Sequence, residues 1–217
     1  MRLAGVCVGT DDLGAAEGAY QLLLGVPAAA RSATMVRFVL RNGSVDLVPG
    51  HGFRALRFVD DDAAAPGAVR GVPILTDAER DELPPVEAAA SIDHIVVQTV
   101  DPEAAIAWWR DRMGLRLALD REFPARGLRL LFFRSGGITL EYASPLPAVP
   151  TTGDRSADDR IHGVSYRVTD LVVRRDRLVA AGVDVSEPRP GMRPGTTVAT
   201  VRSGTAGVPT LLLQVDA

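Results

Sequence analysis

Residues 91–143 read SIDHIVVQTVDPEAAIAWWRDRMGLRLALDREFPARGLRLLFFRSGGITLEYA, and the succession of patterns in this stretch decides the fold. A strand rich in Ile and Val, Ile92–Gln98, is followed by Asp101 and Pro102, a pair typical of a helix start. Apolar residues then recur at helical spacing until Gly114, which is suited to end a helix. Turn residues separate three further expected strands, at 115–123, 127–134 and 138–143. The predicted order is therefore β-α-β-β-β.

The same unit recurs in residues 160–217. RIHGVSYRVTD resembles SIDHIVVQTVD, so that His162 falls on His94 at a separation of 68 residues (162 − 94), with one extra residue before Asp170. The last strand, PTLLLQVDA, places Gln214 where ITLEYA places Glu141. A helix at 171–181 and strands at 183–187, 196–202 and 209–215, the last of which carries Gln214, are expected to complete the copy. Because one copy cannot bury its sheet alone, two copies are expected to pack into one curved sheet.

The N-terminal third is a more divergent copy of this repeat. At an offset of 89 residues Gly5 takes the place of His94, and Asp46 lies near the place of Glu141 but needs a register shift to match it. Strands are expected around an Asn42-Gly43 turn, FRALRFVDD starts a half-copy, and AERDELPPVEAAA indicates a short helix and a linker. We therefore predict an α+β fold of tandem βαβββ modules, with a degenerate βαβββ-type domain at 1–85. Paired modules at 91–145 and 160–217 make up a second domain, 86–217.

Composition excludes several classes of function. The chain has 217 residues, is 47% hydrophobic and carries a net charge of −3, which gives no reason to expect a nucleic-acid or membrane partner. No apolar run approaches the ~20 residues of a membrane span, and the start MRLAGVCVGTDD lacks the features of a signal peptide, so we expect a cytoplasmic protein. All 24 basic residues are arginines, which excludes lysine Schiff-base chemistry and a Walker-type phosphate loop.

The paired modules resemble the vicinal oxygen chelate superfamily, which includes glyoxalase I, methylmalonyl-CoA epimerase, extradiol dioxygenases and bleomycin resistance proteins. In that family the first and last strands of each module hold a divalent metal in the cleft. By position, the resemblance implies the ligands His94, Glu141, His162 and Gln214. It also implies that the paired modules form the metal cleft and that the N-terminal domain, with Gly5 in place of His94, is metal-free. This mixed N/O donor set suits Fe, Mn, Co, Ni or Zn without choosing among them. A lone strand histidine is more often structural than a ligand, but two at matched repeat positions favour a metal site.

Neighbouring residues are assigned from strand alternation. Gln98, Thr139 and Tyr166 share faces with the implied ligands and are predicted to bind substrate. Arg193, together with Arg189 in the loop EPRPGMRPG, is placed to meet an anionic substrate.

Three classes of function follow from the resemblance. The first is a metal-dependent, glyoxalase-like enzyme that isomerises, epimerises or cleaves a small carbonyl or enediol substrate, with Glu141 moving the proton. The second is an Fe(II) extradiol-type dioxygenase, although that family takes its carboxylate from the strand where this chain has Gln214. The third is a non-catalytic, drug-sequestering binding protein. All three take a small-molecule partner, and pairing into a homodimer is left open.

Overall fold

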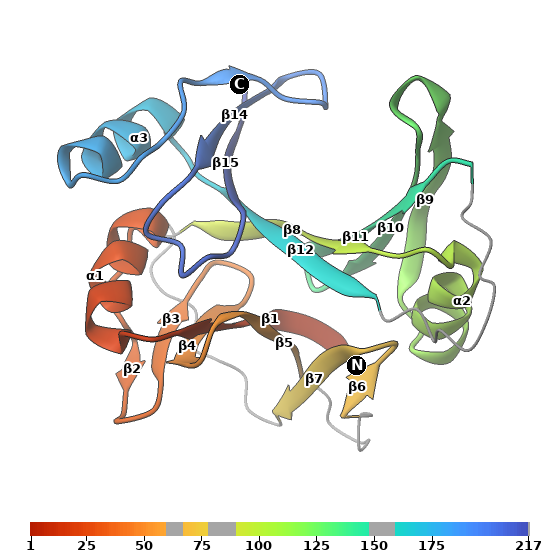
Figure 1. Cartoon of the computed structure of the whole chain (residues 1–217), viewed down its shortest axis with the longest axis horizontal. Helices are drawn as coiled ribbons and strands as arrows, with labels where there is room; N and C mark the ends of the chain where they lie inside the picture. The colour runs from red at the N-terminus through yellow and green to blue at the C-terminus, as the bar shows by residue number, and fades with distance from the viewer. Residues whose placement is uncertain (60–66, 78–89, 148–158, 217) are drawn as a thin grey trace.

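The computed structural model describes residues 1–59, 67–77, 90–147 and 159–216, and these form two mixed β-sheets flanked by helices (Figure 1). The first sheet has seven strands in the order β2-β3-β4-β1-β5-β7-β6. Its strands are β1 (Arg2–Thr10), β2 (Ala30–Arg31), β3 (Val36–Val39), β4 (Ser44–Pro49), β5 (Gly52–Val59), β6 (Ala68–Val69) and β7 (Val72–Asp77).

The second sheet has eight strands in the order β13-β14-β15-β12-β8-β11-β10-β9. Its strands are β8 (Ser91–Gln98), β9 (Arg116–Phe123), β10 (Leu128–Ser135), β11 (Ile138–Pro145), β12 (Arg160–Arg167), β13 (Arg189–Pro190), β14 (Thr196–Val201) and β15 (Thr210–Val215). The helices are α1 (Leu13–Leu24), α2 (Pro102–Ile106), which continues as a π-helical segment (Ala107–Arg112), a short 3-10 helix (Pro124–Arg126) and α3 (Leu171–Ala180).

Both sheets have the same topology at their centres. In the first, β1 runs parallel to β4 and antiparallel to β5, which in turn runs parallel to β7. In the second, β8 runs parallel to β11 and antiparallel to β12, which runs parallel to β15. The predicted α+β fold of tandem βαβββ modules is thus confirmed, and the N-terminal third builds a sheet of the same design.

Local sequence signals explain where the helices begin. The side chains of Asp12, Asp101 and Asp170 each accept a hydrogen bond from the backbone amide three residues later, which satisfies one of the free amides of the first turn. Gly25 ends α1 in the left-handed conformation (φ 75°), as glycine does most readily.

One predicted strand is wrong. Residues 183–187 do not form a strand; Val185 makes only a single bridge to Val201, and the edge strand is instead β13. Pro188 follows this segment directly, and a residue without an amide hydrogen cannot extend a ladder there. The segments at 78–89 and 148–158, which include the predicted linker helix, lie outside the described residues.

The two sheets share one hydrophobic core. Phe58 of the first sheet stacks on Trp109, with ring centroids 5.8 Å apart, and the Tyr20 hydroxyl donates a hydrogen bond to the Thr205 carbonyl (3.1 Å). Asn42 binds both backbone groups of Ile92, donating to its carbonyl (2.8 Å) and accepting from its amide (2.9 Å). The N-terminal sheet therefore packs behind the second sheet and leaves the opposite face of that sheet open.

The N-terminal sheet contains a buried charge cluster where the second sheet has Glu141. Asp46 pairs with Cys7 in the β1–β4 ladder just as Glu141 pairs with Val96 in the β8–β11 ladder, so the two carboxylates match without a register shift. Asp46 accepts two 2.8 Å hydrogen bonds from Arg37 and lies 3.6 Å from Arg57, which is 1% exposed. This carboxylate is therefore fully engaged by guanidinium groups.

Within the described ranges, no helix is both long and apolar enough to cross a membrane.

Candidate active-site cleft

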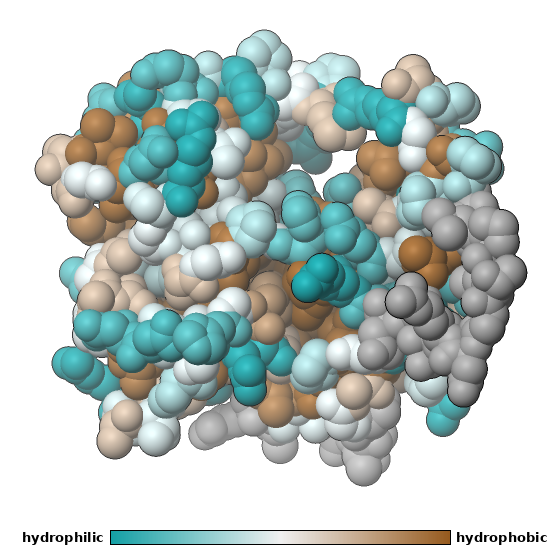
Figure 2. Space-filling view, in the orientation of Figure 1, coloured by the Kyte–Doolittle hydropathy of each residue, from teal (hydrophilic) through white to brown (hydrophobic). Residues whose placement is uncertain are grey.

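The open face of the second sheet carries a cleft of about 280 Å³. It lies between the arm formed by β9 and β10 and the arm formed by β13, β14 and β15, where the space-filling view is hollowed (Figure 2). Apolar side chains make much of its lining, and three arginines stand at its rim. The apolar group is Leu130, Phe132, Met192, Val198, Leu211 and Leu213; the arginines are Arg134, Arg189 and Arg193.

Glu141 lies on β11 and lines this cleft. Its carboxyl has no ion pair in the described part of the chain. Burial raises the pKa of this carboxyl above its usual range; nearby His94 partly offsets the effect, whereas Asp93 adds to it. A carboxyl of this kind is suited to accept and return a proton.

His94 is held on both sides by hydrogen bonds. Its Nδ1 lies 2.9 Å from Oδ2 of Asp93, and its Nε2 lies 2.8 Å from Oγ of Ser165 on the neighbouring strand. Adjacent residues of a strand normally point to opposite faces, but a bulge occurs here. Ser165 pairs with His94 while Tyr166 pairs with Ile92, so Asp93 is the extra residue and its side chain also lines the cleft.

Asp93 is the anionic end of this arrangement. Burial alone would raise the pKa of its carboxyl, but hydrogen bonds from His94 and Arg167 outweigh burial and lower the pKa to about 2. The Nε of Arg167 lies 3.0 Å from Oδ1 of Asp93. An ionised Asp93 can only accept, so Nδ1 of His94 carries a hydrogen and the hydroxyl of Ser165 can donate to Nε2.

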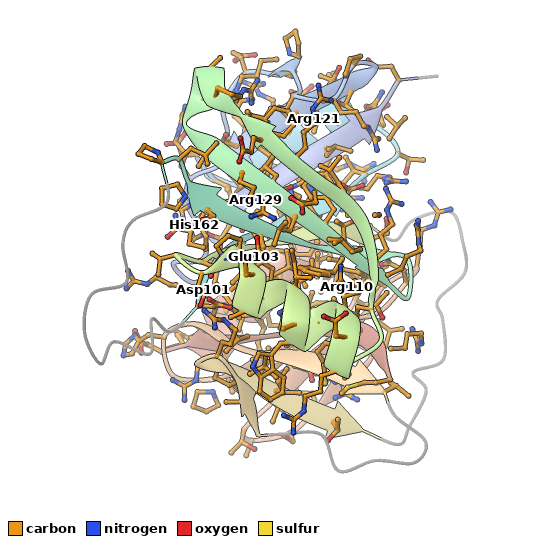
Figure 3. The ribbon with its side chains drawn as sticks, turned by 90° about the vertical axis from the view of Figure 1, so that its right-hand side faces the viewer. Asp101, Glu103, Arg110, Arg121, Arg129 and His162 are labelled. Carbon is orange, nitrogen blue, oxygen red and sulfur yellow. The ribbon has the colours of Figure 1, made fainter. Side chains whose placement is uncertain are left out.

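His162, a predicted ligand, is not brought to this cleft. The caps Asp101 and Asp170 fix the true offset between the modules at 69 residues (170 − 101), which equates His94 with Gly163. His162 is the unpaired residue of a second bulge, between the pairs Ile161–Val97 and Gly163–Val96. Its side chain is exposed and lies near the margin of the molecule (Figure 3). The 68-residue match fails because the sequence shows that there is one extra residue before Asp170 but does not show that this residue is His162 itself.

Gln214, the other predicted ligand of the second module, lies on the opposite face of the sheet. Its Oε1 accepts a hydrogen bond from the Leu171 amide (2.7 Å) at the start of α3. The residue that matches Glu141 is Leu211, because Glu141 pairs with Val96 and Leu211 pairs with Ser165, 69 residues (165 − 96) further along. Gln214 is three residues (214 − 211) beyond Leu211, and because side chains alternate along a strand, this odd-numbered difference puts the two on opposite faces.

Gln214→Ala should therefore affect the helix and not the cleft. The Leu171 amide would lose its partner, at a cost of about 0.5–1.5 kcal/mol in the free energy of unfolding. Urea denaturation measures this loss, and ligand binding in the cleft should stay unchanged. Unchanged stability together with lost binding would contradict the assignment of Gln214 as a helix cap.

The predicted substrate-binding residues divide in the same way. Thr139 and Arg193 line the cleft, whereas Tyr166 is fully buried in the core. Gln98 lies at the far end of β8, beside a separate cavity of about 440 Å³. Sequence reasoning missed Asp93, Ser165 and Arg134 in or beside the cleft. Asp93 and Ser165 could have been found only by anticipating the bulge.

The predicted donor set does not fit a metal ion as folded. Of the four expected ligands only His94 and Glu141 face the cleft, and both ring nitrogens of His94 are already engaged. Among the residues with described positions, no group of three or more His, Cys, Asp or Glu side chains is arranged to hold a metal ion.

Part of the chain is similar in sequence to known proteins. Residues 93–200 match the family model described as Glyoxalase/Bleomycin resistance protein/Dioxygenase superfamily. Over 106 residues the chain is 29% identical to an ethylmalonyl-CoA/methylmalonyl-CoA epimerase of Cereibacter sphaeroides, covering 46% of this chain and 79% of the relative.

Two solved structures are similar to the chain. A hypothetical protein from Bacillus halodurans C-125 has a TM-score of 0.48 at 21% identity, covering 59% of this chain and 96% of that one. Methylmalonyl-CoA epimerase from Mycobacterium tuberculosis has a TM-score of 0.45 at 20% identity, covering 58% and 87%. Residues 93–200 of this chain belong to the glyoxalase/bleomycin resistance protein/dioxygenase superfamily.

Proposed function

We propose that this chain is an isomerase-type enzyme that moves a proton on the carbon next to a carbonyl group of a small anionic substrate. The observation that carries the proposal is the position of Glu141, a largely buried carboxyl in an apolar cleft with arginines at its rim. A carboxyl without a cationic partner is costly to bury, so its place in an open cleft favours a chemical role over a structural one.

Each group in the cleft has a task in the proposed reaction. Glu141 removes the proton, and the planar enolate that results is reprotonated on either face, by Glu141 or by water at the open side of the cleft. The guanidinium groups of Arg134, Arg189 and Arg193 attract and orient the anionic part of the substrate. Apolar side chains of β10 and β15 exclude water around the reacting carbon, which strengthens these charge interactions.

The similarity to an ethylmalonyl-CoA/methylmalonyl-CoA epimerase suggests the first substrates to test. A single epimer of methylmalonyl-CoA or ethylmalonyl-CoA is incubated with the chain in deuterated water, with a chelator or with added divalent ions. We expect loss of chirality and deuterium incorporation at the acidic carbon, measured by NMR and mass spectrometry. A 2-oxoaldehyde–thiol adduct tests the glyoxalase-type reaction in parallel. Binding without exchange for every substrate would contradict the proposal.

The arginines provide a matched comparison. Arg193→Gln should raise KM with little effect on kcat, because it removes an attraction that acts on bound substrate and transition state alike. Arg177→Gln, an exposed position on α3, serves as the control and should leave both constants unchanged.

Binding without turnover is the second candidate function. The observation in its favour is that Gly163 and Leu211 occupy the two donor positions of the second module. Equal binding of substrates by the parent protein and by Glu141→Gln, with no exchange in either, would support it.

A further inference from the structure

We propose that this cleft functions without a divalent metal ion, and that Asp93 and Ser165 are positioning residues that hold His94 in one tautomer. The inference concerns the same cleft as the proposed function but rests on separate observations. It also differs from what the resemblance to the superfamily implies, namely a four-ligand metal site.

Both ring nitrogens of His94 already have hydrogen-bond partners. A histidine binds a metal through a ring nitrogen with a free lone pair. Here Nδ1 is 2.9 Å from Asp93 and Nε2 is 2.8 Å from Ser165, and Asp93 is itself fixed by Arg167. Ser165 is 2% exposed and directly opposite His94 in the ladder, so its hydroxyl occupies the lone pair that a metal ion would need.

The second module has no side-chain donor at either of the two positions that match His94 and Glu141. Gly163 stands where the second module should supply its first-strand ligand, and a Cβ atom there would lie 2.4 Å from the carbonyl oxygen of Pro209. No side chain fits at that distance unless the backbone moves. Leu211, which stands where the second carboxylate would be, has no donor atom at all.

The N-terminal sheet has lost its first donor in the same way. Gly5 takes the place of His94 there, and a Cβ atom on Gly5 would lie 2.3 Å from the carbonyl oxygen of Ser44. In both modules the glycine lies beside a bulge and allows close approach of two backbones.

The charged side chains around the cleft are mainly positive. Glu141 is one carboxylate, and Asp93 is neutralised by Arg167, whereas Arg134, Arg189 and Arg193 add positive charge around the opening. This balance favours an anion and opposes a dication.

Metal analysis tests the proposal directly. The untagged chain is expressed with Mn, Co, Ni, Zn or Fe(II) in the medium, dialysed, and analysed for bound metal. We expect far less than one equivalent and no shift in melting temperature when these ions are added. Stoichiometric metal that is lost in His94→Ala but kept in His162→Ala would overturn the proposal. The second variant controls for adventitious binding at an exposed histidine.

The tautomer of His94 is a second readout. The chain has three histidines, so His51→Ala and His162→Ala assign the imidazole signals in a nitrogen-15 NMR spectrum. We expect His94 to carry its hydrogen on Nδ1 in mildly alkaline buffer. Ser165→Ala should shift the Nε2 signal and Asp93→Asn should disturb the tautomer, whereas Ser203→Ala should change neither. A hydrogen on Nε2 in the parent protein would contradict the assigned roles.

These measurements separate this inference from the proposed function. Metal content and tautomer are observed without substrate, so they can fail while deuterium exchange succeeds. An enzyme that exchanges deuterium only with added metal would retain the proposed function and refute the metal-free cleft.

Discussion

Glu141→Gln should abolish deuterium exchange and at the same time make the protein more stable at neutral pH. Loss of a general base typically costs about 10²–10⁴-fold in rate, and glutamine keeps the shape of the side chain but cannot accept the proton. Exchange of the acidic hydrogen measures the first effect, and urea denaturation measures the second.

The sign of the stability change follows from the pKa of Glu141, which burial raises. A carboxyl whose pKa is higher in the folded state is harder to ionise there than in the unfolded chain. The parent protein should therefore lose stability, relative to the variant, as the pH rises through the pKa of folded Glu141. Below the pKa of the unfolded carboxyl the two proteins should be equally stable. Glu122→Gln, an exposed position on β9, is the control and should show no such trend. Reduced stability of Glu141→Gln at neutral pH would mean that the carboxylate has a cationic partner.

Asp46→Ala should destabilise the protein by about 3–5 kcal/mol, the usual cost of removing one member of a buried ion pair. Its two hydrogen bonds to Arg37 would be lost, and Arg57, 1% exposed, would keep a buried charge without this carboxylate. The urea midpoint of the variant measures the loss.

Two further variants of the cluster sharpen this test. Asp11→Ala removes an exposed carboxylate and should change stability by less than about 0.5 kcal/mol. A double variant, Asp46→Leu with Arg57→Met, removes both charges and should recover much of the lost stability, because apolar residues often replace a buried pair without penalty. A single variant as stable as the parent would show that water reaches the cluster.

The fold was predictable because its signals are local and repeated. Capping aspartates, the Ile- and Val-rich strands and the turn glycines recur in each copy, so element type and order follow from the sequence. The face of the sheet on which each side chain lies was harder to predict. A bulge is set by the competition between two ladders and has no sequence signature of its own, yet it reverses the face of every later residue on the strand.

The candidate site shows this limit in two particular residues. His162 and Gln214 have the side chains expected of ligands, but His162 is one residue from Gly163, which matches His94, and Gln214 is three residues from Leu211, which matches Glu141. His94 and Glu141 both line the cleft, because β8 and β11 pair in parallel with Thr139 opposite His94 and Glu141 opposite Val96. The role of Ser165 depends on a cross-strand contact, which the sequence could not reveal before the register was known.

The two hydrogen bonds between the Asn42 side chain and the Ile92 backbone affect how the protein can be engineered. It anchors the strand that carries His94 only two residues away, and it is made by a turn of the N-terminal sheet. A chain shortened to the part that matches the family model would lose that anchor and uncover Trp109, whose ring stacks on Phe58. A version of the cleft that is transferred to another protein would therefore need both sheets. If the first sheet were removed, the face of the second sheet that packs against it would have to be redesigned.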